Sequence, residues 1–261
     1  MSLRIFFIGL AASFGIAWLA VVVVPFYKMR SLPPVTLNEA DDGATGIFFP
    51  KRTGRIANGA KVYAENGCYH CHTQLVRPTY AGNDLFRTDW GGLKTDPDRG
   101  DTRRETTAYD YFGESFAQIG VTRAGPDLSN LGRRLTTYEP NRETRPKGHN
   151  EPIAAKDPEA WLYRHLYRPR SLSDDWNSTC PPHPFLFEVV DATGATPALA
   201  IPDEALFGDR DDDGKVLPEG KAMVPGPDAR ALVSYLLSLK KDQDVPKALD
   251  FNPEPKPEKK P

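Results

Sequence analysis

The sequence predicts a mainly α-helical protein, with a single N-terminal transmembrane helix and one extramembrane domain that contains long loops. Three observations lead to this prediction. An uncharged, mostly apolar run lies near the N-terminus, apolar residues recur at helical spacing in a few later segments, and 25 of the 261 residues are proline. The proline content is about twice the usual ~5%. Because proline lacks a backbone N–H and ends helices, we expect short helices joined by long loops.

The apolar run extends over 22 residues, from Ile5 to Phe26. In an α-helix it would span ~33 Å, enough to cross a hydrocarbon core of ~30 Å. A cleaved signal peptide is the alternative, but its apolar region usually has ~7–15 residues and ends at a small-x-small site. Here the run is longer, and Trp18 stands where a small residue is needed. We therefore predict that residues 1–28 form an uncleaved membrane anchor.

The rest of the chain divides by composition into three parts. Residues 29–52 are predicted to be a proline-containing linker, and residues 53–240 one domain. Residues 241–261 are charged and rich in proline, and a segment of this kind cannot bury enough apolar surface to become ordered. We therefore predict a disordered C-terminal tail.

Helices within the domain are predicted from apolar spacing and from end signals. One is expected over Arg55–Asn66, and another begins at Asp157-Pro158-Glu159, where an N-cap residue precedes a proline at the first helical position. A last helix is expected to start near Pro227, whereas the polar stretch Ala81–Ala108 is predicted to be a loop. No convincing run of strands is present.

The charge balance excludes one class of partner. Lysine and arginine number 33 against 35 acidic residues, a net charge of −2, so there is no basic excess to hold nucleic acid. The three cysteines are too few for a disulfide scaffold. Their spacing carries more information than their number.

The segment Cys68-Tyr69-His70-Cys71-His72 has the C-x-x-C-H pattern of c-type haem attachment. Two thiols three residues apart can each bond to a vinyl group of one porphyrin, and the following histidine is then the proximal iron ligand. A redox dithiol or half of a zinc site are alternatives, but no second Cys/His pair at zinc spacing follows and no βαβ pattern surrounds the motif. We therefore predict one covalent haem c. In c-type cytochromes the helix before the motif crosses the terminal helix, and Gly59 beside Tyr63 fits the close approach.

Haem attachment of this kind takes place outside the cytoplasmic membrane. This fixes an orientation that the flanking charges leave open, because Arg4 lies on one side of the apolar run and Lys28 and Arg30 lie on the other. We predict a single-pass protein of the cytoplasmic (inner) membrane, with its N-terminus inside and its haem domain in the periplasm.

Four sequence blocks together resemble one family. The block Gly67–Pro78 resembles the pattern G-C-Y-x-C-H-x-Q-x-x-R-P of the membrane-anchored monohaem subunit (subunit II) of cbb3-type cytochrome c oxidase. The other three blocks follow in the family's order: Arg123–Leu128 with Gly132-Arg133, His165–Arg170, and Pro181–Leu186. With the anchor, the resemblance covers most of residues 1–190. It implies a periplasmic cytochrome c domain that passes electrons to a separate catalytic haem–copper oxidase subunit.

The same resemblance implies a non-catalytic role in a respiratory complex. Electrons would arrive from another c-type cytochrome subunit or from a soluble cytochrome c. Two alternatives stay open: the anchored cytochrome c subunit of a nitric oxide reductase-like complex, which lacks the His165–Arg170 block, and a haem-based redox or gas sensor.

The distal iron ligand is where this chain departs from the family. The family places a liganding methionine immediately before P-x-Y-P, and this chain has Cys180 at that position. A cysteine sulfur lies one bond nearer the backbone than a methionine sulfur, and a change of axial ligand can move a haem potential within a range of ~0.8 V. Met223, which precedes the last helix, and His183 are the other candidates, and a vacant position is the fourth possibility.

Further site residues are expected from the chemistry of the proximal histidine and of the haem. A proline-bearing loop accepts the second ring N–H of the proximal histidine in cytochromes c, so Gly125-Pro126 is the predicted acceptor for His72. Four arginines could contact haem propionates or a partner subunit: Arg77, Arg123, Arg133 and Arg134. The alternative for each of them is a solvated position at the protein surface. His165 lies on an apolar helical stripe and is predicted to be a packed histidine.

The segment Asp209–Val216 fits the start of a D-x-D-x-D-G calcium loop. Asp209, Asp211 and Asp213 would supply the oxygen ligands. Gly220 stands where the bidentate acid is expected, however, and no flanking helices are predicted. The sequence therefore leaves two alternatives, a calcium site and a plain acidic surface loop.

Overall fold

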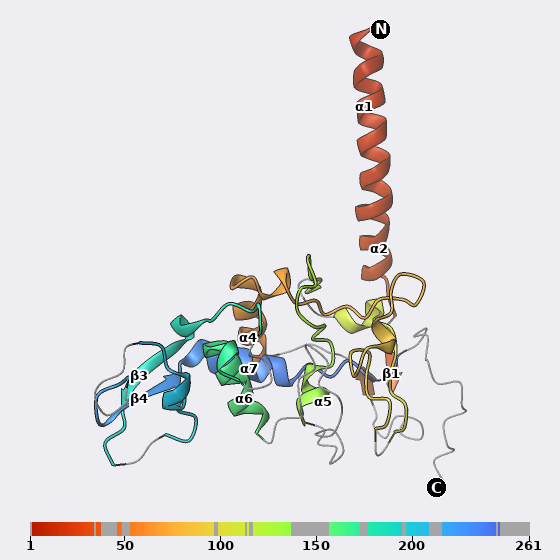
Figure 1. Ribbon diagram of the computed structural model, residues 1–261. Coiled ribbons are helices and arrows are strands. Elements are labelled where there is room, and N and C mark those ends of the chain that lie inside the picture. The colour runs from red at the N-terminus through yellow and green to blue at the C-terminus, as the bar shows by residue number, and fades with distance from the viewer. Residues whose placement is uncertain are drawn as a thin grey trace.

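The computed structural model describes residues 2–33, 35–37, 46–48, 53–96, 99–112, 114, 117–136, 157–172, 177–194, 197–208, 216–243 and 245. Figure 1 shows a long N-terminal helix that stands out from a domain of short helices and long loops. The predicted mainly helical composition is confirmed. Two short antiparallel strand pairs, which were not predicted, accompany the helices.

The N-terminal helix runs without a break through three segments. These are α1 (Leu3–Trp18), the π-helical η1 (Leu19–Val23) and α2 (Val24–Arg30). Pro25, the second residue of α2, has no N–H to donate, and irregular turns of this kind commonly accompany a proline inside a helix. By length and composition Leu3–Arg30 can cross a membrane, and its most apolar window is not buried by the domain. A signal sequence meets the same criterion of length and composition.

The predicted linker contains the first strand pair. β1 (Val35–Leu37) pairs antiparallel with β2 (Gly46–Phe48), with Val35 opposite Phe48. A two-stranded pair of this length has little stability of its own.

The domain is organised around the contact between its first and last helices. α4 (Gly54–Glu65) and α7 (Pro227–Leu237) lie where helices were predicted, and they touch at Gly59. A Cβ at Gly59 would overlap the Ala231 carbonyl and lie 2.6 Å from the Cβ of Tyr235. The predicted role of Gly59 in a close helix approach is therefore confirmed.

Two shorter helices complete the core. Asp157 caps α6 (Pro158–Tyr167) as predicted, because its carboxylate accepts from the Glu159 and Ala160 N–H groups at 3.1 and 3.0 Å. α5 (Leu131–Thr136) packs against α7 as well. The apolar residues that these helices bury in common are Val62, Tyr63, Leu131, Leu135, Leu162, Tyr163, Leu166, Tyr167, Leu232, Tyr235 and Leu236.

A second strand pair precedes α7. β3 (Phe187–Asp191) pairs antiparallel with β4 (Lys221–Pro225), in a register that sets Val189 opposite Met223. The strands are short and far apart in the sequence, so local alternation gives little sign of their pairing. Three further single turns of 3-10 helix lie in this half of the domain: η6 (Pro169–Ser171), η7 (Pro184–Leu186) and η8 (Asp203–Ala205).

The polar stretch around Ala81–Ala108 is a loop, as predicted, with a short turn at η3 (Asp84–Phe86) and with η4 (Ala108–Tyr111) at its end. Buried ion pairs hold it together with a few buried apolar side chains, Leu85, Trp90 and Leu93. Arg104 and Asp110 are each 1% exposed in their side chains and lie 2.6 Å apart.

The predicted boundary of the disordered tail is wrong. Lys241 and Asp242 are buried, and the Asp242 carboxylate pairs with Arg99 at 2.8 Å and with Arg133 at 3.1 Å. The compositional argument failed because Asp242 meets arginines that are far away in the sequence, and because Lys241 lies over the ring of Tyr111. Most of the remaining tail lies outside the described residues.

Candidate functional site

The C-x-x-C-H side chains lie immediately after α4. Gly67 adopts the left-handed conformation (φ +67°) and turns the chain into the 3-10 turn η2 (Cys68–His70). The His72 N–H then donates to the Cys68 carbonyl at 2.9 Å, so the five motif residues form one compact turn. Cys68 and Cys71 are half-buried, and His70 is exposed, as predicted for a spacer.

The orientation of the His72 ring is fixed by a contact at its Nδ1 atom. Its Nδ1 lies 3.0 Å from the Pro126 carbonyl oxygen, the contact predicted for the Gly125-Pro126 loop. Because a carbonyl can only accept, Nδ1 carries the proton and Nε2 keeps its lone pair. Gly125 packs so closely on the ring that a Cβ there would overlap it. Tyr63, which the sequence gave no reason to single out, donates from its hydroxyl to the His72 carbonyl at 3.1 Å.

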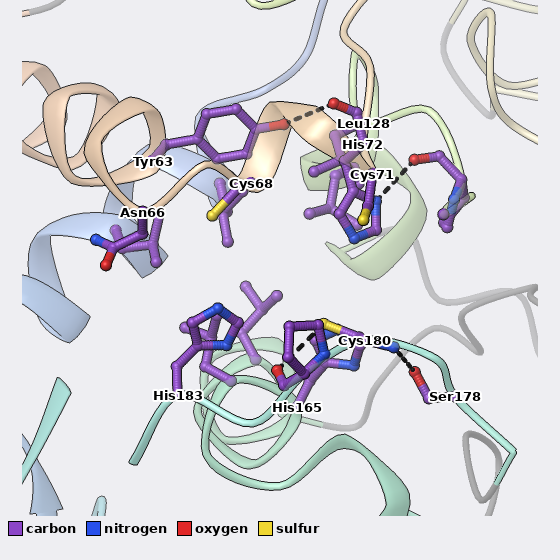
Figure 2. Close-up of a pocket in the computed structure, with 18 of the residues that line it drawn as sticks. Tyr63, Asn66, Cys68, Cys71, His72, Leu128, His165, Ser178, Cys180 and His183 are labelled. Atoms are coloured by element: carbon purple, nitrogen blue, oxygen red, sulfur yellow. Dashed lines mark hydrogen bonds between the residues drawn. The ribbon is translucent and has the colours of Figure 1, made fainter. Parts of the chain in front are cut away.

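The motif forms one wall of a partly open pocket with a volume of about 170 Å³. Figure 2 shows Cys68, Cys71 and His72 on one side and His165, Cys180 and His183 on the other. Apolar side chains from three helices and from the loop before α5 supply much of the remaining lining: Leu128, Leu131, Trp161, Leu162, Leu166, Leu232 and Leu236.

His165 is a pocket residue that sequence reasoning interpreted as merely packed. It extends from α6, and its ring stacks on that of Trp161, with centroids 5.1 Å apart and planes 11° apart. The spacing of four residues between Trp161 and His165 was the available signal, because it places both side chains on one helix face. His183 stands nearby, and burial, followed by the charge of His165, lowers its pKa.

The thiol groups differ in their electrostatics. Burial raises the pKa of Cys180, but hydrogen bonds and charge from His165 and His72 outweigh it and bring the pKa down to about 6. Burial, followed by the nearby Cys180, instead raises the pKa of Cys68 to about 12. A redox dithiol needs an easily formed thiolate, so the value for Cys68 argues against that alternative.

The three proposed distal ligands are not equivalent in position. Cys180 and His183 line the pocket opposite His72, whereas Met223 does not. Met223 lies in β4, its side chain packs against the core, and its carbonyl accepts from the Ile201 N–H at 2.8 Å. The location of Cys180 in the pocket agrees with the position that the family gives to its ligand.

The arginines predicted to be near haem propionates do not line the pocket. Arg77 and Arg123 both pair with Asp84, at 2.8 and 2.6 Å, and Arg133 pairs with Asp242. Arg134 is buried and donates to the Asp127 carbonyl at 2.6 Å. Arg77 and Arg133 therefore lie outside the pocket lining, because buried carboxylates attract their guanidinium groups elsewhere.

Metal sites other than the motif find no support in the described part of the chain. No group of three or more His, Cys, Asp or Glu residues is arranged there to hold a metal ion, which disfavours the zinc alternative. The predicted calcium ligands Asp209, Asp211 and Asp213 lie outside the described residues.

Comparison with known proteins adds no assignment. No protein-family model matches the chain, and no curated protein is found to be similar to it. The functional argument therefore depends on the site itself.

Proposed function

We propose that this chain is a membrane-anchored, electron-transferring c-type cytochrome that carries one covalent haem c. Cys68 and Cys71 would hold the porphyrin, and His72 would be the proximal iron ligand. The observation that supports this most strongly is the shared wall: the three motif side chains line one pocket, and Nδ1 of His72 is bound to Pro126. That hydrogen bond leaves Nε2 as the ligand atom.

The residues fit a haem group in three respects. The pocket is partly open and mostly apolar, which suits a flat macrocycle that has one polar edge. Gly125 leaves the space that the ring of His72 occupies, because a Cβ at this position would overlap that ring. The two thiols stand on the same wall, and Cys68 remains a neutral thiol.

Attachment needs only these thiols and two vinyl groups. Each S–H would add across one vinyl C=C bond, so that an S–C bond forms and the hydrogen passes to the neighbouring vinyl carbon without net oxidation. Once bound, the haem iron supplies the one-electron chemistry. The protein residues hold the proximal ring, limit access of water and supply the distal group.

Cys180 is the proposed distal ligand. It lies across the pocket from His72 and interacts with both His72 and His165. His183 shares this wall and is the second candidate. Thiolate ligation would give a haem of low potential, because the anionic sulfur favours the ferric state.

The wider role follows from the sequence resemblance. We propose a subunit of a cbb3-type oxidase, in which the domain lies in the periplasm and Leu3–Arg30 anchors it to the cytoplasmic membrane. Electrons would pass from a c-type cytochrome donor through this haem to a catalytic haem–copper subunit.

A gas sensor is the second candidate, because the distal wall carries a cysteine and two histidines in place of methionine. Difference spectra with carbon monoxide and nitric oxide separate the two functions. A six-coordinate haem that ignores both gases supports electron transfer, whereas reversible binding of either gas supports a sensor.

Haem staining after denaturing electrophoresis tests the proposal directly. The full chain, expressed with a haem-attachment system, should give a stained band that resists acidified organic solvent. The double variant Cys68→Ala/Cys71→Ala should lose this band, and Cys180→Ser, the matched control at the third cysteine, should keep it. Haem that is extractable from the unaltered protein would contradict covalent attachment.

A further inference from the structure

The wall behind His72 consists of two chain segments joined along their length. The Gly125 N–H donates to the Cys71 carbonyl at 2.9 Å, and the Leu128 N–H donates to the Thr73 carbonyl at 2.8 Å. Between these two bonds lies the contact of His72 with the Pro126 carbonyl. The acceptor of the ring proton is therefore part of a loop whose position depends on its attachment to the motif segment.

Asp127 is the side chain that joins this loop to the segment beyond His72. Its Oδ2 accepts from the Leu75 N–H at 2.9 Å, and its Oδ1 accepts from the Ser129 N–H at 2.7 Å. The residue is fully buried, at 0% exposure. One carboxylate thus fixes both the turn that follows Pro126 and the segment that follows His72.

The carboxylate is suited to this task because both of its oxygens accept hydrogen bonds. Burial raises the pKa of Asp127, and the Ser129 and Leu75 N–H groups and the charge of Arg134 act against that change. Arg134 also donates to the Asp127 carbonyl at 2.6 Å, which restrains the backbone at the same point. An asparagine has the same shape but only one acceptor oxygen, so it would set an NH₂ group against one of the two N–H donors.

We propose that Asp127 is a positioning residue for His72, one that holds the Pro126 carbonyl against Nδ1 and so sets the donor strength of the proximal ligand. The inference rests on the proposed haem function. A hydrogen bond to the second ring nitrogen makes an imidazole a stronger donor and stabilises the more oxidised metal. Loosening the loop weakens that bond, so the midpoint potential should rise.

Asp127→Asn tests the proposal, and Asp110→Asn is the matched control. Asp110 is also buried and interacts with an arginine, but its carboxylate accepts from the Thr107 N–H and not from the segments on either side of His72. Asp127→Asn should raise the midpoint potential in a redox titration, and Asp110→Asn should not. In the reduced protein, the His72 ring N–H should exchange with solvent roughly tenfold faster or more in Asp127→Asn. A factor of this size corresponds to the free energy lost when a hydrogen bond to a charged acceptor, here the Asp127 carboxylate, is removed.

A measurement on the unaltered protein covers the case in which Asp127→Asn does not fold. If Asp127 joins the two segments, the His72 ring N–H and the Leu75 N–H should open together and show the same free energy of exchange. Clearly different values would overturn the proposal, and so would equal potentials in Asp127→Asn and Asp110→Asn. Absence of covalent haem from the unaltered protein would instead refute the proposed function, and haem staining distinguishes the two failures.

Discussion

The two walls of the pocket are built in different ways. The proximal wall is the side that carries the motif and His72, and the distal wall is the side that carries Cys180 and His183. On the proximal wall, backbone hydrogen bonds, the Asp127 carboxylate and the Pro126 carbonyl fix the segment around His72 at several points. On the distal wall, the Cys180 N–H donates to Ser178 Oγ at 3.2 Å, and its thiol lies 3.6 Å from the Pro181 carbonyl and interacts with the side chains of His165 and His72. The His72 ring is thus held in one orientation by several contacts, whereas the distal side depends mainly on which side chain is present.

Ion pairs farther from the pocket also hold the two segments of the proximal wall. Arg77 follows the motif segment and Arg123 precedes the Gly125 loop, and both reach the same buried carboxylate of Asp84. Arg123 adopts φ +54°, a strained value for a residue with a side chain, and its ion pair with Asp84 helps to hold it there. The proximal wall is therefore fixed by a second layer of interactions.

The largest expected effect follows from adding one methyl group to the proximal wall. In Gly125→Ala the new Cβ would overlap the His72 ring, so the ring must move away from Pro126. We expect a loss of stability of about 3 kcal/mol, together with an altered haem spectrum. Denaturant unfolding and the visible spectrum of the haem-loaded protein measure the two effects.

Gly59→Ala is the control for Gly125→Ala. Its Cβ would overlap α7 and also destabilise the fold, but it does not contact His72. The folded fraction of Gly59→Ala should therefore keep the normal spectrum. A normal spectrum and potential in Gly125→Ala would show that the proximal ring is not tightly held.

The second prediction concerns Asp84, which joins the two sides of the proximal wall. Burial raises the pKa of Asp84, but hydrogen bonds from Arg77 and the charges of Arg123 and Arg77 bring it below its ordinary value. A carboxylate with a lowered pKa stabilises the fold above its unfolded pKa of ~3.9, and this contribution is lost as the pH falls through the folded value. Asp84→Asn should therefore cost about 3 kcal/mol at neutral pH, because two arginines lose their buried partner.

The pH dependence makes the test of Asp84 specific. The stability difference between Asp84→Asn and the unaltered protein should shrink when urea unfolding is repeated below the pKa of Asp84. Asp191→Asn, an exposed carboxylate paired with Lys221, is the matched control and should change little at either pH. A constant difference at both pH values would mean that Asp84 acts through packing and not through its charge.

The proximal wall could be predicted from the sequence to a greater extent than the distal wall. The motif turn depends on five neighbouring residues, and the contact of His72 with Pro126 was expected from the resemblance to c-type cytochromes. The partners of Arg77 and Arg133 could not be read in the same way, because long charged side chains pair with whichever carboxylate the folded chain brings near. Local sequence gives no information about Asp84 and Asp242 as acceptors.

The distal wall and its surroundings depend on contacts between distant segments. His165 looked like a core residue because its helix stripe is apolar, and only the placement of α6 across from the motif brings it to the pocket. The β3–β4 pair joins strands separated by about thirty residues, so its register follows from folding and not from a turn signal. This pairing also holds Met223 outside the pocket.

The third prediction changes the distal wall alone. Cys180→Ser nearly keeps the size of the side chain and removes the sulfur, so the spectrum should change, whereas stability should change little because the serine hydroxyl can take over the polar contacts of the thiol. Cys180→Met should restore the family arrangement and raise the midpoint potential, because a neutral thioether stabilises ferrous iron better than a thiolate does. If Cys180→Ser leaves the spectrum unchanged and His183→Asn alters it, the distal ligand is His183.

The smallest effect is expected for Met223→Leu. The exchange conserves volume in a packed position and should cost less than about 1.5 kcal/mol. The backbone bond from Ile201 and the pairing of β4 with β3 do not involve the side chain, so the strand should stay in place. The visible spectrum and the midpoint potential should therefore be those of the unaltered protein.

If Met223→Leu instead abolishes the six-coordinate spectrum while Cys180→Ser leaves it unchanged, then β4 must shift to bring the methionine to the iron. The distal wall would in that case take its final form only when haem binds, whereas the proximal wall is already held in place by its own hydrogen bonds.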